Sequence, residues 1–386
     1  MQVSIAGGGV AGTVCAIALR RIGADVTVYE AYPDPAGSIG SFLSLAGNGL
    51  RALDAVGCLA AVQNVGQAVP TQRFWSSNGR LLGETARGRK SGDPLHSVTL
   101  RRADLVSALR EQATAAGARV VTGERVVGAD EDGDRVRVHL ANGDTVDSDL
   151  LVGADGIWST VRTLLDPHAP RPVYAGIYTA SGTATATATA DVDVEPGILN
   201  MTFARGGAFI HGAGHDGTVW WAAQVAEPDQ PDLGTVDLAS LRDRYRHEPH
   251  VLAVLAAATH LYRPTLDHVL APVPTWRGTR TVLVGDAAHP VGAGQGASMA
   301  IEDAVVLAQR LTTAPVPAAL AAYEDTRRPR ITKVLKTGRD SRARKTRGPL
   351  RRRVDDAVMS FGIKHFHEKA TSWLYTYDVG PLPVSA

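Results

Sequence analysis

The sequence has 386 residues, of which 44% are hydrophobic and 20% are charged, a composition typical of a globular protein rather than a disordered chain. Its 40 basic and 39 acidic residues leave a net charge of +1, so no strong overall field attracts nucleic acid or anionic lipid, and we expect neither as a partner. The two cysteines, Cys15 and Cys58, have no CxxC spacing, which argues against a metal site or a disulfide framework and favours the cytoplasm.

The apolar stretches of the sequence are too short or too interrupted to predict a membrane span. Residues 3–19 are mostly apolar, but three consecutive glycines break the run and no basic segment precedes it, so we expect no secretory signal peptide. No other run approaches the roughly 20 apolar residues that a membrane-spanning helix needs. We therefore expect no membrane contact.

The first 30 residues predict a strand–helix–strand unit. An apolar strand at 2–6 is followed by glycines, and apolar residues then recur at helical spacing over 10–22, where Gly23 ends the helix. The β-branched run 25–30 predicts a second strand. About 30 residues is the length of a parallel βαβ crossover.

The segment that follows, up to residue 171, mixes helices and short strands. The helix expected at 102–116 carries Leu105, Leu109 and Ala113 on one face. Asp-Gly and Asn-Gly turns after residues 131 and 141 predict neighbouring antiparallel strands. The other expected elements are a loop at 33–40, a helix at 48–56, short strands within 70–94, strands at 119–121, 126–130, 135–140 and 145–148, and a buried strand at 149–154.

From about residue 172 to 272 the pattern changes to the alternation of a sheet with one packed face and one wet face. Thr and Ala alternate over 183–190, which favours a strand, with a flexible loop as the alternative. Further along the chain we expect a strand at 218–225, helices within 238–258, a buried strand at 281–284, a helix at 298–311 and a helix-like segment that reaches residue 377.

These elements predict an α/β protein with a parallel Rossmann-type sheet, a second β-sheet region and C-terminal helices. We expect a nucleotide-binding domain made of residues 1–70, 97–171 and 272–330. Residues 71–96 and 172–271 would form a substrate-binding β-sheet domain, and 331–386 a helical C-terminal region.

The strongest local motif is G-x-G-x-x-G between the first strand and the first helix. In it Gly7 permits a tight turn, Gly9 lets a pyrophosphate approach the backbone, and Gly12 lets the helix pack closely on the strand. Val10 and Ala11 complete the loop at the helix N-terminus, where unpaired N–H groups favour phosphate. Glu30 ends the second strand, where a carboxylate would accept hydrogen bonds from ribose hydroxyls.

Two further motifs each place an aspartate directly after a buried strand, at the usual ligand crevice of an α/β sheet. Asp155 begins the segment D-G-I-W-S-T-V-R, and Asp286 lies in G-D-A-A-H-P. The second motif continues into G-Q-G and a long helix. The N-terminus of such a helix would stabilise negative charge on a nearby flavin.

Together these residues resemble the class A flavoprotein monooxygenases, the family of para-hydroxybenzoate and salicylate hydroxylases. The family marks are G-x-G-x-x-G, D-G-x-x-S-x-V-R, and G-D-A-A-H-P leading to G-Q-G and E-D-A. In this chain their order and spacing extend from Gly7 to Ala304. The resemblance implies FAD as the cofactor, NAD(P)H as electron donor and O2 as co-substrate.

The resemblance also assigns roles by position. It implies that Glu30 binds the adenosine ribose, that Arg102 lies near the FAD pyrophosphate, and that Asp155 belongs to a motif shared by FAD and NAD(P)H binding. Asp286 would bind the ribityl and pyrophosphate region. The candidate flavin-binding residues that follow in the chain are Pro290, Gly294, Gln295, Gly296, Ala297 and Ser298.

The chain departs from the family pattern beside the flavin. Only residues 291–293 separate His-Pro from G-Q-G, where the family has a longer turn, and Ser298 stands where the family has asparagine. We therefore transfer no substrate from relatives. His289 is expected to shape its turn rather than to act as a base, and Gly37 and Gly40 could form a hinge for flavin motion or belong to an ordinary loop.

The function that these residues predict is a monooxygenase that hydroxylates or epoxidises an aromatic or polyene small molecule through a flavin C4a-hydroperoxide. The cofactor carries this chemistry, which explains why no catalytic triad is needed. The alternatives are a flavin reductase or dehydrogenase without oxygen insertion and a flavin-binding protein without turnover. Either a monomer or a homodimer is compatible with the sequence.

Overall fold

The computed structural model describes residues 1–34, 42–185, 194–214, 216–292, 294–345, 360–363 and 365–383, with side chains described up to residue 337 and again from 360. The candidate hinge glycines Gly37 and Gly40 lie outside the described residues. So does the second half of the Thr–Ala run. In the described part of the chain, no helix has both the length and the apolar character to cross a bilayer.

The first sheet is parallel. Its strand order is β19-β12-β1-β2-β8, and all four pairings are parallel. The strands are buried because helices and a second layer cover both faces. They are β1 (Gln2–Ala6), β2 (Asp25–Glu30), β8 (Arg119–Thr122), β12 (Leu150–Gly153) and β19 (Thr281–Leu283).

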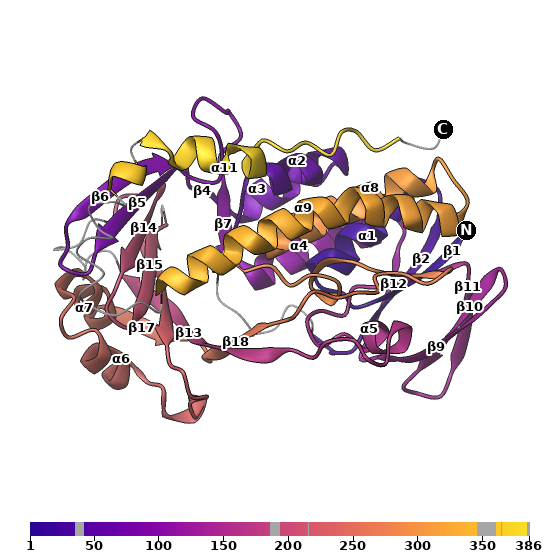
Figure 1. Cartoon of the computed structure of the whole chain (residues 1–386), viewed down its shortest axis with the longest axis horizontal. Helices are drawn as coiled ribbons and strands as arrows, with labels where there is room; N and C mark the ends of the chain where they lie inside the picture. The colour runs from indigo at the N-terminus through magenta and orange to yellow at the C-terminus, as the bar shows by residue number, and fades with distance from the viewer. Residues whose placement is uncertain are drawn as a thin grey trace.

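Helices cover one face of this sheet. Helix α1 contacts both α4 and α8, while α8 in turn contacts α2 and α9. Their bounds are α1 (Val10–Arg21), α2 (Gly47–Ala55), α3 (Leu59–Val65), α4 (Arg102–Ala115), α8 (Gly296–Leu311) and α9 (Val316–Lys345). Figure 1 shows α9 running lengthwise across the molecule beside α8. The other side is covered by α5 (Thr160–Leu165) and by a three-stranded antiparallel sheet of β9 (Val126–Asp132), β10 (Arg135–Leu140) and β11 (Thr145–Ser148).

The second sheet has eight strands and is largely antiparallel. The order is β17-β13-β16-β15-β14-β5-β6, with β18 also paired to β13, and only the β14–β5 pairing is parallel among the described pairs of this sheet. The strands are β5 (Thr71–Ser76), β6 (Leu81–Ala86), β13 (Val173–Thr185), β14 (Ile198–Phe203), β15 (Gly207–Ala213), β16 (Thr218–Ala226), β17 (Ala258–Leu261) and β18 (Thr265–Val269).

The two faces of the second sheet differ, as the alternation predicted. Ala180, Phe209 and Trp221 belong to a separate apolar cluster with residues of α6 (Leu238–Arg244) and α7 (Pro249–Ala256). On the opposite face, Thr183 and Trp220 are only partly buried. The strand prediction for the Thr–Ala run is therefore confirmed up to Thr185, the last residue of β13.

A short sheet lies beside the first one and links it to the second. Its order is β3-β7-β4, with β3 (Phe42–Leu45), β4 (Gln67–Ala68) and β7 (Val98–Arg101). The C-terminal helix α11 (His367–Tyr375) contacts α2 and β6, and so touches both halves of the molecule. The predicted fold class is confirmed, while the domain boundaries stay a prediction.

Candidate flavin site

The turn from β1 to α1 meets the space requirements of its three glycines. Gly7 has φ +102°, and a Cβ there would lie 2.5 Å from the carbonyl oxygen of Ala154. A Cβ on Gly12 would lie 1.9 Å from the carbonyl oxygen of Gly7. Gly9 is different, because its nearest neighbour would be Nη2 of Arg102, 4.0 Å away. Gly7 and Gly12 are therefore needed for close packing, whereas Gly9 leaves open space beside the Arg102 guanidinium.

The N-terminus of α1 is suited to an anion. Gly9 caps the helix without a side-chain hydrogen bond, and the first turn contains no acidic residue. The first backbone N–H groups and the helix dipole therefore favour a phosphate group here. Arg102, the first residue of α4, donates no hydrogen bond or ion pair to another described residue, so its guanidinium is available at the same place.

Glu30 is buried at the end of β2 and faces the same turn. Its Oε2 accepts a hydrogen bond from the Gly8 N–H at 2.7 Å, and its Oε1 accepts one from the Tyr32 N–H at 2.8 Å. Each carboxylate oxygen can accept a further bond. The side chain is thus fixed in orientation and keeps acceptor capacity for two hydroxyl groups.

Asp286 lies in a short 3-10 turn between β19 and α8. At Gly285 this turn packs closely against both α1 and α8. Gly285 has φ +58°, and its Cβ would meet Ala11 at 3.0 Å and Ala300 at 3.1 Å. The Asp286 side chain is accessible to water but deep in the molecule. Burial among the surrounding protein atoms raises the pKa of its carboxyl, against the opposing effects of His289 and Arg102.

The N-terminus of α8 lies beside Asp286. A Cβ on Gly296 would be 3.6 Å from Asp286 Oδ1, and the helix begins without a side-chain cap or an acidic first turn. Gly294 has φ +76° and nothing within 4 Å of an added Cβ. Pro290 and Ala297 are partly buried near this end. This helix end therefore also presents free N–H groups toward open space.

Residues Gln295 and Ser298 tie this helix start to β3 and α2. Gln295 is buried, and its Oε1 accepts a hydrogen bond from Asn48 Nδ2 at 3.4 Å. Ser298 Oγ accepts one from the Ala46 N–H at 3.4 Å. A Cβ on Gly49 would lie 2.5 Å from Ser298 Oγ, so α2 packs here without room for a larger residue. The short side chain of Ser298 allows this close approach of α2.

The structure uses Asp155 differently from the other candidates. Its Oδ1 accepts a hydrogen bond from Ser159 Oγ, and its Oδ2 accepts from the N–H groups of Thr160 and Val161 at 2.7 and 3.1 Å. Asp155 therefore stabilises the start of α5. Arg162, from the same motif, donates to the carbonyl oxygen of Ala287 at 3.0 Å and so fastens this loop to the Asp286 turn.

A buried ion network behind the Asp286 turn was not anticipated from the sequence. Arg327 of α9 has a fully buried side chain and donates from Nη1 to Glu302 at 2.6 Å and from Nε to Asp303 at 2.7 Å. Asp303 also accepts from the Gly285 N–H at 2.9 Å and lies 2.6 Å from His289 Nε2. These bonds fix the turn that carries Asp286, which agrees with a shaping role for His289.

Ionisation of this network is strongly perturbed. Burial alone would raise the pKa of Asp303, but His289 and Arg327 together lower it to about 2. Arg330 adds bonds of 2.7 and 2.8 Å to Glu302. Two adjacent acids within the otherwise apolar stretch 299–308 of this helix are the signal that could have revealed the network, because buried carboxylates need cationic partners.

The chemistry of these residues fits FAD. A pyrophosphate can be held by the N-termini of α1 and α8, by Arg102 and by the open space beside Gly9. The buried Glu30 can hold a ribose. Among the described residues, no group of three or more His, Cys, Asp or Glu is placed to bind a metal.

A nucleotide-binding parallel sheet joined to a largely antiparallel second sheet defines a two-part flavoprotein. Residues 1–337 match the family described as "FAD binding domain", and the chain belongs to this family. It is an FAD-dependent monooxygenase, as the motifs predicted.

Similar proteins agree with this assignment. The chain is 31% identical over 337 residues to the aurachin C monooxygenase/isomerase of Stigmatella aurantiaca, covering 85% of each protein. It is 32% identical over 353 residues to the kynurenine 3-monooxygenase of Salinispora arenicola, covering 85% of this chain and 76% of the relative. The fold is also that of Klebsiella pneumoniae HpxO complexed with FAD and uric acid, with a TM-score of 0.85, 22% identity, and coverage of 99% and 98%.

Proposed function

We propose that the protein uses NAD(P)H and O2 to insert one oxygen atom into an aromatic or polyene small molecule. The observation that carries the proposal is that Arg102 lies beside Gly9 at the uncapped N-terminus of α1 and Asp286 lies beside Gly296 at the uncapped N-terminus of α8. The turn at Gly285 packs against both helices. When bound, FAD would supply the redox chemistry by accepting a hydride from NAD(P)H and, once reduced, reacting with O2.

The protein's own residues would bind and orient the cofactor. The α1 N-terminus and Arg102 would neutralise the pyrophosphate, and Glu30 would accept hydrogen bonds from the adenosine ribose. The α8 N-terminus would place its positive end near the pyrimidine edge of the flavin, where it would stabilise negative charge. Asp286 would contact the linking chain, held in place by the bonds around Gly285.

A matched pair of binding and turnover measurements tests this function. Purified protein should be yellow, should release FAD on denaturation, and should transfer one atom from labelled O2 to a co-substrate while NAD(P)H is consumed. Flavin-dependent turnover that continues without O2 and yields no labelled product would instead establish a reductase or dehydrogenase. Bound FAD without NAD(P)H oxidation over a broad co-substrate screen would favour a flavin-binding protein without turnover.

The variant Gly9→Ala tests the cofactor site. Gly9 has φ −76°, and its added Cβ would have no neighbour closer than 4.0 Å, so the fold should tolerate alanine. The new methyl group would occupy the space where the pyrophosphate approaches. We expect the FAD dissociation constant to rise at least about tenfold, with little change in the unfolding of the cofactor-free protein. Unchanged FAD affinity would place the pyrophosphate elsewhere.

A further inference from the structure

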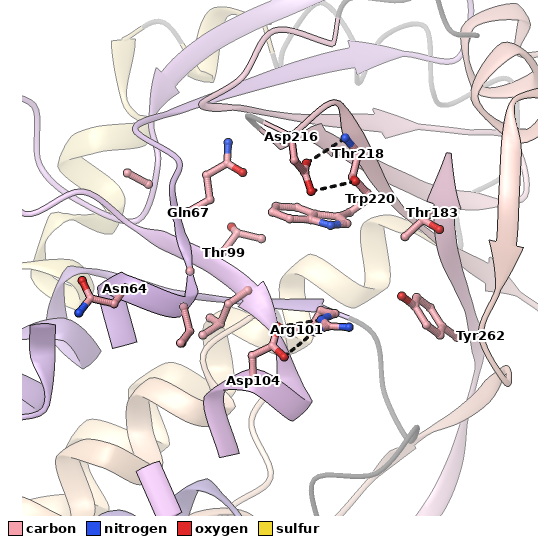
Figure 2. A pocket seen from close by; sticks show the side chains of 14 residues that line it. Asn64, Gln67, Thr99, Arg101, Asp104, Thr183, Asp216, Thr218, Trp220 and Tyr262 are labelled. Carbon is pink, nitrogen blue, oxygen red and sulfur yellow. Dashed lines mark hydrogen bonds and ion pairs between the residues drawn. The ribbon is translucent and has the colours of Figure 1, made fainter. Parts of the chain in front are cut away.

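A cavity of 560 Å³ lies between the second sheet and the part of the chain formed by α3, the β3-β7-β4 sheet and α4. Its walls come from α3, β4, β7 and the start of α4 on one side, and from β13 and β16 on the other (Figure 2). Its volume is within the range of small-molecule sites, about 300–1,000 Å³. Asp155 and the buried ion network take no part in its lining.

Two routes along the chain lead from this cavity toward the candidate flavin site. Arg101, in the wall, directly precedes Arg102. The ring of Trp220, also in the wall, lies 6.2 Å from that of Phe42 at the start of β3. Strand β3 then leads to Ala46, whose N–H donates to Ser298 at the start of α8. The wall of the cavity is therefore continuous, through β7, with the strand that leads to Arg102, and it contacts the strand that leads to Ser298.

The lining is suited to a flat molecule with polar substituents. Trp220 lies at its centre in Figure 2, partly buried, and Tyr262 lies across from Arg101. Such rings bind aromatic ligands through stacked or edge-on contacts. Asn64 and Thr183 are also among the lining residues, and their amide and hydroxyl groups can hydrogen bond to a ligand, whereas Thr99 is fully buried and bonded to Ser44.

The charges of the lining do not suit an anion. Arg101 is the only cationic residue among the described residues that line the cavity, and it is paired to Asp104 through two bonds of 2.7 Å each. Asp216 is also in the wall and accepts hydrogen bonds from the N–H and hydroxyl of Thr218 at 2.9 and 3.0 Å. The bond from the Thr218 N–H lowers the pKa of Asp216, which keeps the carboxylate ionised. One cation and two acids give the lining a net negative charge.

We propose that this cavity receives the organic substrate and selects uncharged or cationic aromatic molecules over carboxylates. The proposal rests on the proposed monooxygenase function, since it names the substrate class of that reaction. An arginine already neutralised by its own aspartate offers little attraction to a carboxylate, and Asp216 repels one. A hydroxyl or ammonium substituent meets no such repulsion.

The test uses the FAD-loaded enzyme and three probes that share one ring system. These are 2-naphthol carrying a hydroxymethyl, an aminomethyl or a carboxylate group at the same ring position. Equilibrium dialysis measures their dissociation constants without requiring turnover. We expect the alcohol and the amine to bind at least about fivefold more tightly than the carboxylate at low salt. A carboxylate that binds as tightly as the alcohol, or three probes that all fail to bind, would overturn the proposal.

Two variants separate the sources of the selectivity. Asp216→Asn keeps the shape and an acceptor for the Thr218 N–H but removes the charge, so discrimination against the carboxylate should decrease several-fold. Asp104→Asn releases Arg101 from its partner and should raise carboxylate affinity. The control Asp232→Asn alters an aspartate that accepts a similar turn hydrogen bond, from the Gly234 N–H at 2.9 Å, but does not line the cavity. Discrimination should not change there.

The outcomes distinguish this proposal from the proposed function. Yellow protein that oxidises NAD(P)H with O2 but binds the carboxylate best would refute the substrate class and leave the monooxygenase intact. Selective probe binding by protein that never binds FAD would support the cavity and refute the monooxygenase. Discrimination that stays the same in both cavity variants would show that these aspartates do not set it, and would refute the charge argument.

Discussion

Replacing Arg327 by methionine is expected to destabilise the protein more than any single surface change. Its side chain is 0% exposed and makes ion pairs with Glu302 and Asp303, together with a bond of 3.2 Å to the Met299 carbonyl oxygen. Methionine fills a similar length without charge. The variant would leave the two buried carboxylates with Arg330 and His289 as their ion-pairing partners, besides the neutral donors Asn48 and the Gly285 N–H.

The magnitude follows from the charges left behind. Removing one partner of a buried ion pair typically costs about 3–5 kcal/mol, because the other charge stays buried without compensation. Glu302 keeps two bonds from Arg330, which argues for the lower part of that range. An arginine in an exposed pair should lose no more than about 1 kcal/mol, and Arg246→Met is the matched control, since its pair with Asp243 lies at the surface.

Equilibrium unfolding in urea, at equal FAD saturation, measures both variants, and its pH dependence is a second test. The folded pKa of Asp303, about 2, is below the ordinary value of 3.8, so its ionisation contributes stability above about pH 4 that is lost as pH falls toward 2. Without Arg327 this pKa rises and the contribution shrinks. The difference in unfolding free energy between wild type and Arg327→Met should therefore decrease as the pH falls from about 4 toward 2. A neutral-pH loss no larger than the control's, or a gap independent of pH, would refute the reasoning.

Three further predictions concern the candidate site. In Glu30→Gln the side-chain NH2 would face one of the two backbone N–H groups that now donate to Glu30, so that N–H would lose its acceptor. We expect the unfolding free energy to fall by about 1–3 kcal/mol and FAD to bind more weakly in a titration. Equal FAD affinity would exclude Glu30 as a ribose ligand. Asp155→Ala removes the carboxylate that accepts from the first N–H groups of α5 and from its N-cap Ser159. It should lower the thermal midpoint by the equivalent of about 1–2 kcal/mol, and FAD affinity that falls far more than stability would show direct cofactor contact. Gly12→Ala should impair folding itself, seen as low yield and lost near-ultraviolet dichroism, and a normally folded variant would contradict the 1.9 Å approach.

The local patterns predicted much of the first sheet and its helices. The opening unit was expected at 2–6, 10–22 and 25–30, and the structure has Gln2–Ala6, Val10–Arg21 and Asp25–Glu30. Those elements are set by residues close in sequence. Helix α8 begins two residues earlier than expected, at Gly296. Glycine usually indicates a loop, but here it forms the first turn of the helix, whose N-terminus has no side-chain cap.

The sequence was least informative about α9 and its role. The sequence predicted a helical C-terminal region only over 331–386. The structure instead has a helix from Val316 to Lys345 that continues through Pro329, a residue that ordinarily ends a helix. What holds it is tertiary: Arg327 and Arg330 bind acids on α8. The motif E-D-A identified Glu302 and Asp303, but their partners Arg327 and Arg330 lie on another helix, and no nearby sequence pattern predicts that pairing.

The parallel pairing of β5 with β14 governs how the chain can be divided. Residues 71–76 are made before most of the nucleotide-binding sheet is complete, yet their partner strand comes at 198–203. Cutting the chain once between these strands would deprive the second sheet of its outer pair and leave β14 with an unpaired edge. A stable half-protein is therefore not to be expected from any truncation there, and assembly must wait until both segments have been synthesised.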